Sequence, residues 1–236
     1  MSEPLVIPCP HCNGLNRIPG ERLGDAPKCG RCKQSVLLNK PFDLKQGDYA
    51  NQIKGDLPLL VQHFMLGPGW AEGCKSCSFM ADHLDGMAPH LAQRDIALLV
   101  VSRAPLAEIE AFRHRMGWRF AWASSHGSAF NHDFNVSFGP QDRVDGAVFY
   151  NFRMTPFPAE EAPGISIFCK DDAGAVCHTY STFGRGVEVM MGTYGLIDLT
   201  PRGRDEAGLD HTMAWVRHHD RYETGGTAAA CCGART

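Results

Sequence analysis

The sequence predicts an α/β domain preceded by a small cysteine-rich module, and two observations support this fold class. Between residues 57 and 125, apolar runs of strand length alternate with stretches of helical spacing, which predicts a parallel sheet with helical crossovers. The first 38 residues carry four cysteines and few large apolar side chains. We therefore divide the chain into a module at 1–38, a linker at 39–56, the α/β domain at 57–223 and a disordered tail at 224–236.

The four cysteines of the first module have the spacing of a tetrahedral zinc site. They follow the pattern C-x2-C-x16-C-x2-C and are Cys9, Cys12, Cys29 and Cys32. Because this segment is too polar to bury a core, zinc would supply its folding free energy, which is of order 10 kcal/mol in zinc-finger peptides. His11 lies within the first pair, but four thiolates already complete a tetrahedron. The sequence therefore predicts a structural zinc ion; the alternative is a chance cluster of reduced cysteines.

A second motif, Cys74-Lys75-Ser76-Cys77, has the spacing of a redox dithiol. It follows an apolar run at 57–65 and a glycine-rich loop, and helical spacing continues after it. This order places Cys74 at a helix N-terminus, where the helix dipole, free N–H groups and the charge of Lys75 favour the thiolate. Cys77, one turn inside the helix, would attack the mixed disulfide and release the product. The alternatives are two structural cysteines or half of a metal site.

The remaining elements of the α/β domain are predicted from periodicity. Residues 96–102 and 118–125 form apolar runs typical of buried strands, and 104–117 between them have helical spacing that ends at a glycine. Residues 164–168 and 176–183 predict two strands joined by a hairpin. The helix after the dithiol is expected to bury one face, made of Phe79, Met80, His83, Leu84 and Met87.

Two stretches of the chain resemble known families. Residues 7 to about 61 share CPHC, LNR, KCGRCK and LPLLV with the N-terminal part of zinc-containing bacterial thioredoxins. From about residue 60 to 223, the chain resembles the domain-of-unknown-function 899 family. The motifs that carry this resemblance are HFMLGPGW, GC-x-SCSFMAD, VVSRAPL, FN-x-DFNVSF, HTYSTFGRG and WVRHHDRY. That family is described as thioredoxin-like and as a predicted dithiol-disulfide oxidoreductase. The resemblance implies a thioredoxin-like domain, and the long stretch at 124–160 is closer to its extended, peroxiredoxin-type variant.

Pro163 matches the proline that opens a strand and faces the dithiol in thioredoxin-like proteins. It precedes the predicted strand at 164–168, and the order of proline, strand, hairpin and strand is the thioredoxin order. On this resemblance we expect a cis bond before Pro163 and a role in shaping the groove for an extended substrate. The alternative is a trans proline at a strand edge, because only about 5–6% of X–Pro bonds in folded proteins are cis.

Several positions depart from the thioredoxin pattern. Gly73 rather than tryptophan precedes Cys74, and Trp70 lies four residues upstream. The Lys-Ser pair between the cysteines leaves the reduction potential open. The buried acid that thioredoxins use for proton transfer aligns with Gln62. The side chains weighed as substitutes are His63, Glu72 and His83.

Composition and charge exclude other classes of function. The net charge of −3 gives no basic excess that would attract nucleic acid or an anionic membrane. No apolar run approaches the roughly 18 residues of a transmembrane helix, and the first residues lack a signal-peptide pattern. We therefore expect a cytoplasmic protein with no membrane contact, and we do not expect nucleic acid among its partners.

The expected function is thiol-disulfide exchange, with Cys74, Cys77 and Pro163 as the catalytic residues. The expected substrates are protein or small-molecule disulfides, and a reductase or a thiol would donate electrons. One alternative is a thiol peroxidase in which either cysteine forms a sulfenic acid, although the usual Thr-x-x-Cys setting is missing. Another is a non-enzymatic redox sensor or interaction protein.

Other cysteines and histidines have open roles. Cys169 and Cys177 flank the predicted hairpin, and we favour buried thiols over a pair that faces across it. Cys231 and Cys232 are adjacent in the tail, where they could be reactive or bind soft metals. Surface or partner contacts are favoured over a metal site for His178, His211, His218, His219 and Asp220.

Overall fold

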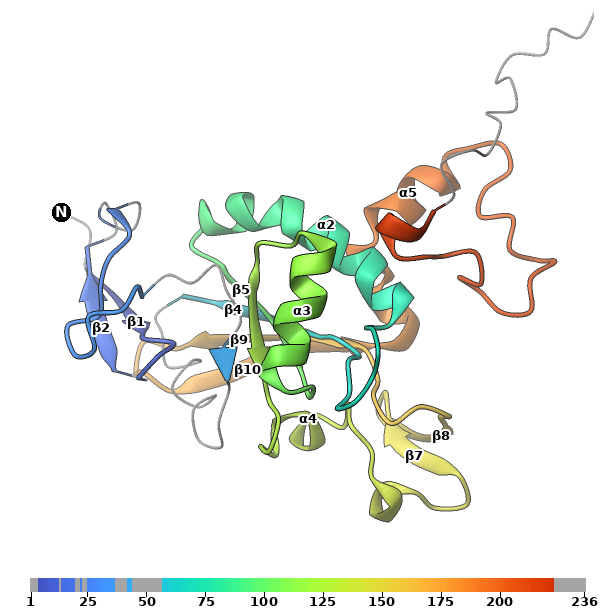
Figure 1. Ribbon diagram of the computed structural model, residues 1–236, viewed down its shortest axis with the longest axis horizontal. Coiled ribbons are helices and arrows are strands. Elements are labelled where there is room, and N and C mark those ends of the chain that lie inside the picture. Colours follow the sequence, from blue (N-terminus) through green and yellow to red (C-terminus); the bar gives the residue numbers. More distant parts are fainter. Residues whose placement is uncertain are drawn as a thin grey trace, which may run out of the picture.

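The computed structural model describes residues 4–12, 14–19, 22, 25–36, 42–43 and 57–222. Most of the predicted linker and the whole tail, with Cys231 and Cys232, lie outside these residues. The N-terminal module contains an antiparallel pair, β1 (Leu5–Pro8) and β2 (Leu15–Ile18), drawn in blue in Figure 1.

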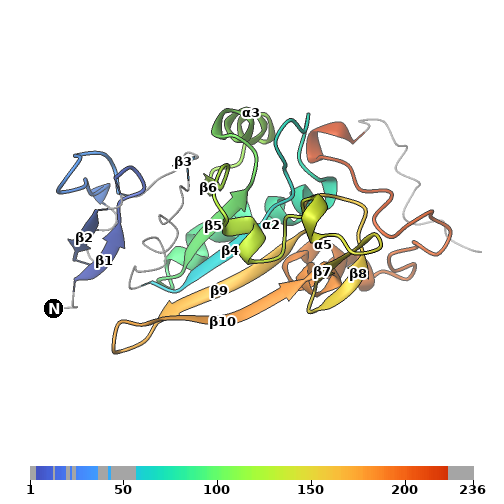
Figure 2. The same cartoon turned by 90° about the horizontal axis from the view of Figure 1, so that it is seen from below.

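The α/β domain is built on a six-stranded mixed sheet of order β10-β9-β4-β5-β6-β3. Its strands are β3 (Phe42–Asp43), β4 (Leu59–His63), β5 (Ala97–Ser102), β6 (Ala121–Ser124), β9 (Gly164–Lys170) and β10 (Val176–Phe183). Strands β3 to β6 pair in parallel, whereas β9 runs antiparallel to β4 and β10 antiparallel to β9. Figure 2 shows the long β9–β10 hairpin along one side of the sheet. The strands predicted within residues 57–183 are confirmed, whereas β3 lies in the stretch predicted as a linker and extends the sheet of the domain.

Two helices cover one face of this sheet, as Figure 1 shows. Helix α2 (Lys75–Ala92) connects β4 to β5, and α3 (Leu106–Met116) connects β5 to β6. Helix α3 ends at Gly117, whose φ of 68° is a left-handed conformation that glycine adopts without steric cost. On α2 the expected apolar residues Phe79, Met80 and Leu84 are buried, whereas Met87, in the second half of the helix, is 39% exposed.

Side chains alternate between the two faces of β4, and this alternation divides the core. Leu60 packs with Met80 and Leu84 of α2. Leu59 and Val61 belong to a separate cluster on the other face. A strand with a helix on one face and a second apolar layer on the other is buried on both sides, which explains why all five residues of β4 are buried.

The stretch that exceeds a minimal thioredoxin folds into short elements between β6 and β9. They are α4 (Phe130–Asp133), the 3-10 turn η2 (Pro140–Asp142), β7 (Ala147–Tyr150) and β8 (Arg153–Pro156). After β10 follow η3 (Gly184–Met190), α5 (Gly192–Asp198) and η4 (His219–Arg221). The parallel core, the antiparallel hairpin and a first helix that begins at the dithiol make the domain thioredoxin-like, as predicted. No helix of the described residues is long and apolar enough to cross a membrane.

Candidate redox site and metal centre

The four N-terminal cysteines converge on one point. Their sulfur atoms all lie within 4.8 Å of one another. The Sγ atoms of Cys9 and Cys32 are 3.5 Å apart, and those of Cys12 and Cys29 are 3.6 Å apart. Zn–S bonds of about 2.3 Å place the sulfurs of a tetrahedron about 3.8 Å apart. The geometry and the thiolate donor set therefore form a metal site that fits zinc.

Backbone groups shape each half of this metal site. The N–H groups of His11 and Arg31 point at the sulfurs of Cys9 and Cys29, both at 3.4 Å. These contacts hold each Cys-x-x-Cys turn in a tight loop. The His11 side chain is exposed and is not part of the sulfur cluster, in agreement with four cysteines completing the site.

Asn16 connects the two cysteine loops, a role that its sequence position does not reveal. Its Nδ2 donates to the carbonyl of Gly14 at 2.8 Å, after the first cysteine pair. Its Oδ1 accepts from the N–H of Gly30 at 2.8 Å, inside the second pair. One amide side chain thus links the two loops and fixes their relative position.

Cys74 and Cys77 occupy unequal positions at the start of α2. Cys74 is the N-cap residue and is half-buried, whereas Cys77 lies in the first turn and is 1% exposed. The Cys74 N–H donates to the carbonyl of Met65 at 3.0 Å, which ties the start of the helix to the end of β4. The carbonyl of Cys74 accepts from both the N–H and the hydroxyl of Ser78 at 2.9 Å.

The two thiols also differ in acidity. The pKa of Cys74 is lowered to about 6, and the largest cause is a hydrogen bond from the Cys77 thiol. Burial opposes this shift, whereas hydrogen bonds from the N–H groups of Cys77 and Ser76 add to it. The same interaction with Cys74, together with burial, raises the pKa of Cys77 well above its ordinary value. Lys75 is exposed, so the low pKa of Cys74 arises from hydrogen bonds at the helix start.

Gly73, the residue before the dithiol, lies against two aromatic rings. A Cβ atom at this position would come within 2.5 Å of Phe64 and 2.7 Å of Phe112. No side chain fits there, which explains why the tryptophan that precedes the dithiol in thioredoxins is absent. The chain can therefore run tightly over the aromatic core before it enters α2.

His218 binds the backbone next to the dithiol, although it lies 145 residues along the chain from Gly73. Its Nε2 is 2.8 Å from the Gly73 carbonyl, and its Nδ1 is 3.2 Å from Nη2 of Arg115. Because a guanidinium only donates hydrogen bonds, Nδ1 is the acceptor and Nε2 carries the hydrogen that is donated to Gly73. His218 is 2% exposed. The predicted surface role of His218 is therefore wrong.

Charged side chains fasten this C-terminal segment to α3 and to the loop before Cys74. Arg115 donates to both oxygens of Asp220 at 2.8 and 2.9 Å and to Glu72 at 2.8 Å. These contacts lower the pKa of Asp220 to about 2 and also lower the pKa of Glu72. His219 adds a 2.7 Å contact with Asp82 of α2. The segment at 215–222 is thus part of the wall around the redox site.

The expectation of a cis bond before Pro163 is wrong, because all described peptide bonds are trans. The sequence order fixes where the proline lies but not its isomer, and trans is the lower-energy form by about 0.5–1 kcal/mol. The position itself agrees with the prediction. Pro163 directly precedes β9, whose first residue, Gly164, pairs with His63 at the end of β4. The Pro163 carbonyl accepts a 2.6 Å hydrogen bond from the hydroxyl of Tyr150.

Gln62 lies beneath the dithiol, where the alignment predicts it. It is fully buried, and its Nε2 donates to the carbonyl of Cys77 at 3.3 Å. Its Oε1 has no hydrogen-bond partner. A neutral amide thus replaces the ionisable acid of thioredoxins at the buried end of the site.

None of the three side chains weighed as substitutes for that acid hydrogen-bonds to either cysteine in the described part of the chain. His63 points to the opposite face of the sheet, where Nε2 is 2.9 Å from Ser166 and burial lowers the pKa of His63 to about 3. His83 binds Thr193 at 2.9 Å. Glu72 is engaged with Arg115.

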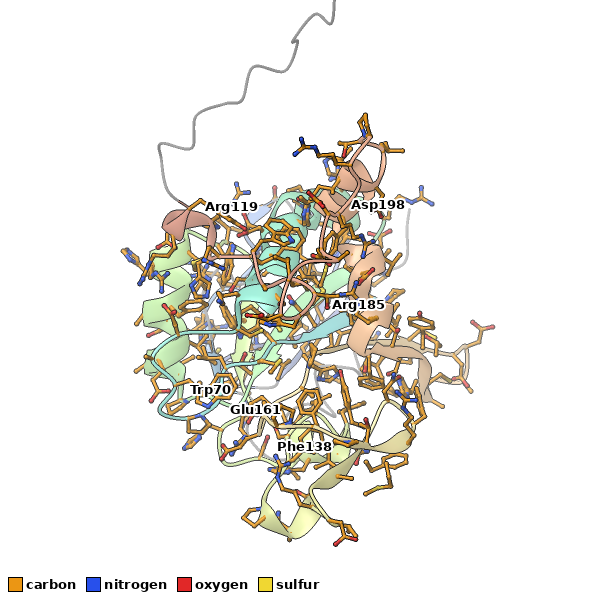
Figure 3. All side chains as sticks on the ribbon, turned by 90° about the vertical axis from the view of Figure 1, so that its right-hand side faces the viewer. Trp70, Arg119, Phe138, Glu161, Arg185 and Asp198 are labelled. Atoms are coloured by element: carbon orange, nitrogen blue, oxygen red, sulfur yellow. The ribbon has the colours of Figure 1, made fainter. Side chains whose placement is uncertain are left out.

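Glu161 is a buried carboxyl group that sequence reasoning missed. It is 1% exposed and accepts from Arg103 at 2.6 Å and from Ser137 at 2.5 Å. Burial raises the pKa of Glu161. Figure 3 shows Glu161 beside Trp70 of the loop that leads to the dithiol. Its partners come from distant segments, so no local pattern identifies it.

The histidines weighed as metal ligands do not form a site. Among the described residues, the four N-terminal cysteines are the only group of His, Cys, Asp or Glu side chains that could hold a metal ion. His178 is bound to Ser181 at 2.7 Å, and His218 is committed to Gly73.

Comparison with known families agrees with this architecture. The profile of the family described as a bacterial protein of unknown function (DUF899) matches residues 42–222. The chain belongs to this family. A second profile, for the N-terminal part of thioredoxin 2, matches residues 8–34 and covers the four-cysteine cluster.

Similar proteins include a thioredoxin and two peroxiredoxins. Thioredoxin C-3 of Corynebacterium nephridii is 36% identical over 85 residues, or 36% of this chain. The match spans 54% of that protein, so the chain covers about half the length of this curated relative. Among solved structures, Xanthomonas campestris peroxiredoxin Q has a TM-score of 0.38 at 10% identity and covers 58% of this chain and 75% of its own. Peroxidoxin BcpB of Mycobacterium tuberculosis has a TM-score of 0.37 at 12% identity, covering 58% and 74%.

Proposed function

We propose that this DUF899 protein is a thiol-disulfide oxidoreductase in which Cys74 attacks the substrate and Cys77 resolves the mixed disulfide. The observation that carries the proposal is the inequality of the two thiols. The half-exposed Cys74 has a pKa of about 6, whereas the pKa of the buried Cys77 is raised. An attacking thiol must be ionised and reachable near neutral pH, and a resolving thiol must stay protonated until it is needed.

The first step is the attack of the Cys74 thiolate on one sulfur of a substrate disulfide. The substrate S–S bond breaks, a mixed disulfide with Cys74 forms, and the other substrate sulfur leaves as a thiolate that takes a proton from solvent. Cys74 no longer carries a negative charge once this bond exists. The largest cause that raises the pKa of Cys77 is its interaction with Cys74, so this cause disappears at the moment when Cys77 must react.

In the second step Cys77 loses its proton and attacks the sulfur of Cys74. The mixed disulfide breaks, the second substrate thiolate leaves and accepts a proton, and the protein retains a Cys74–Cys77 disulfide. The net change transfers two electrons from the protein dithiol to the substrate. A reductase or a thiol donor would then return two electrons to the protein. Protein and small-molecule disulfides are the proposed substrates, and a reducing cytoplasm is the proposed location.

The residues around the dithiol position it for these steps. His218 holds the Gly73 carbonyl, and Gln62 holds the Cys77 carbonyl. Pro163, at the start of β9, is the proposed backbone element beside an extended substrate. Zinc held by the four N-terminal cysteines would cross-link the two loops of the first module and takes no part in the exchange reaction.

Reduction of insulin disulfides with dithiothreitol as donor tests this proposal. Cys74→Ser should abolish the activity, and Cys77→Ser should accumulate a covalent complex with the substrate that a reductant dissolves. Cys169→Ser is the matched control, because it removes a thiol remote from the Cys74–Cys77 pair and should retain insulin reduction. If wild-type protein reduces no disulfide and the Cys77→Ser variant traps none, the proposal is wrong. Consumption of one equivalent of peroxide by that variant, with no trapped disulfide, would indicate the peroxidase alternative instead.

A further inference from the structure

Cys169 and Cys177 lie directly opposite each other on neighbouring strands. The register of the β9–β10 hairpin pairs Cys177 with Cys169, and both thiols are half-exposed. The expectation that they are separate buried thiols is therefore wrong. They lie near the turn end of the hairpin, one pair beyond Val176 and Lys170.

The hairpin brings the two Cα atoms within reach of a disulfide. The N–H of Asp171 donates to the carbonyl of Ala175 at 2.9 Å, just beyond the two strands. Hydrogen-bonded pairs alternate along an antiparallel ladder, so Cys169 and Cys177, two residues further on, form such a pair with Cα atoms about 5.5 Å apart. Disulfides span Cα distances of about 4.4–6.8 Å. Residues that oppose each other in an antiparallel pair point to the same face, so both sulfurs lie on one side of the sheet.

Neither thiol serves another purpose in the described part of the chain. The Cys177 sulfur makes a weak contact with the carbonyl of Ala175 at 3.9 Å. No third His, Cys, Asp or Glu side chain of the described residues joins the pair in a group that could hold a metal ion. The pair is therefore available for reaction.

The pair is also separate from the Cys74 site. Gly164 of β9 pairs with His63 at the end of β4 that leads to Cys74, whereas Phe168 pairs with Leu59 at the other end. Four residues of extended strand cover about 13 Å, so Cys169 lies far beyond the roughly 7 Å Cα separation that limits a disulfide with Cys74.

We propose that Cys169 and Cys177 form a second dithiol–disulfide couple, which exchanges with low-molecular-weight disulfides of the glutathione type independently of the Cys74 site. One thiolate attacks the small disulfide, forms a mixed disulfide and releases one small thiol. The other thiolate attacks that protein sulfur, and the second small thiol leaves. Two protein thiols are oxidised and one small disulfide is reduced to two thiols.

The location of the couple gives it a structural consequence. Within the described part of the chain, β10 is an edge strand of the sheet and pairs only with β9. A disulfide at this position would fix the end of the hairpin and the pairing of the edge strand. Because both cysteines are only partly buried, small thiols can reach the bond and reverse it.

The test uses full-length, zinc-loaded protein in which Cys74, Cys77, Cys231 and Cys232 are all replaced by serine. The protein is incubated with oxidised glutathione, alkylated and digested for mass spectrometry. The proposal expects a Cys169–Cys177 cross-linked peptide, a protein mass lower by two hydrogens, and full reversal by dithiothreitol. Adding Cys177→Ser should leave a stable glutathione adduct at Cys169, because the resolving thiol is gone. If both cysteines remain open to alkylation, or if both carry stable glutathione adducts without a cross-link, the proposal is overturned.

Discussion

The Cys-x-x-Cys pairs of the N-terminal module and of the α/β domain have the same spacing but different surroundings. In the module, each pair turns back in a tight loop, and the second pair brings two more sulfurs to within 4.8 Å. In the domain, the pair stands alone, and an 18-residue helix begins directly after Cys74. The first arrangement brings four sulfurs together around one point, and the second creates one acidic and one buried thiol. The two pairs share their spacing, so the difference in their surroundings comes from the backbone that follows each pair.

The largest expected difference between the two pairs concerns metal binding. Purified protein should contain one zinc ion per chain, and the double substitution Cys9→Ser, Cys29→Ser should remove it together with the folding free energy that it supplies, of order 10 kcal/mol. The double substitution Cys74→Ser, Cys77→Ser should retain one zinc ion per chain. Elemental analysis after metal-free purification measures the zinc content of both variants. If the Cys74/Cys77 variant lost its zinc and the Cys9/Cys29 variant kept it, the metal site would have been assigned to the wrong cysteine pair.

The next expected effect is on the acidity of Cys74. The rate of alkylation of Cys74 should rise with pH through a midpoint near its pKa of about 6, because the thiolate is the reactive form. Cys77→Ala should move this midpoint upward, because alanine cannot donate the hydrogen bond that is the largest cause of the lowered pKa. Peptide mass spectrometry reads the rate at Cys74 alone. An alkylation midpoint near pH 9 in the wild-type protein would show that Cys74 is not more acidic than an ordinary cysteine, which contradicts the proposed difference between the two thiols.

A smaller effect is expected where the C-terminal segment holds the dithiol loop. His218→Phe leaves the buried Gly73 carbonyl without a donor, which costs about 1–3 kcal/mol of unfolding free energy. It should also shift the alkylation midpoint of Cys74, because the position of Gly73 sets the start of α2. His219→Asn is the control, since His219 is 44% exposed and its bond to Asp82 lies at the surface.

Urea unfolding and the alkylation profile together test the role of His218. A loss of stability with an unchanged midpoint would mean that His218 supports the fold without influencing the thiol. An unchanged stability would mean that the contact with Gly73 is not formed in solution.

The smallest expected effect comes from Asp220. Its pKa is lowered to about 2 by Arg115, so its contribution to stability is present above the ordinary value near 3.8 and is lost as pH falls toward 2. Asp220→Asn should therefore destabilise the protein at pH 7 by less than about 1 kcal/mol, because the ion pair is partly exposed. The difference in unfolding free energy between the variant and the wild type, measured by urea unfolding, should disappear as the pH falls from 4 to 2. A gap that widens in acid would contradict the assigned interaction with Arg115.

The sequence alone determined the elements and the chemistry that depend on local spacing. Local patterns in the sequence predict the strands β4, β5 and β10 and the helix α3, because the spacing of apolar side chains is set by neighbouring residues. They also predict the glycine that ends α3 and the position of Cys74 before a helix. The spacing of the four N-terminal cysteines likewise predicted their convergence.

The tertiary structure decided what depends on residues far apart in the chain. His218 reaches Gly73 across 145 residues, and Glu161 reaches Arg103 across 58. The exposure of the Cys169–Cys177 pair follows from how the other segments pack around the hairpin. A local pattern constrains the backbone over a few residues, whereas burial and hydrogen-bond partners are selected only when the whole chain has packed, which is why these features were not predictable from the sequence.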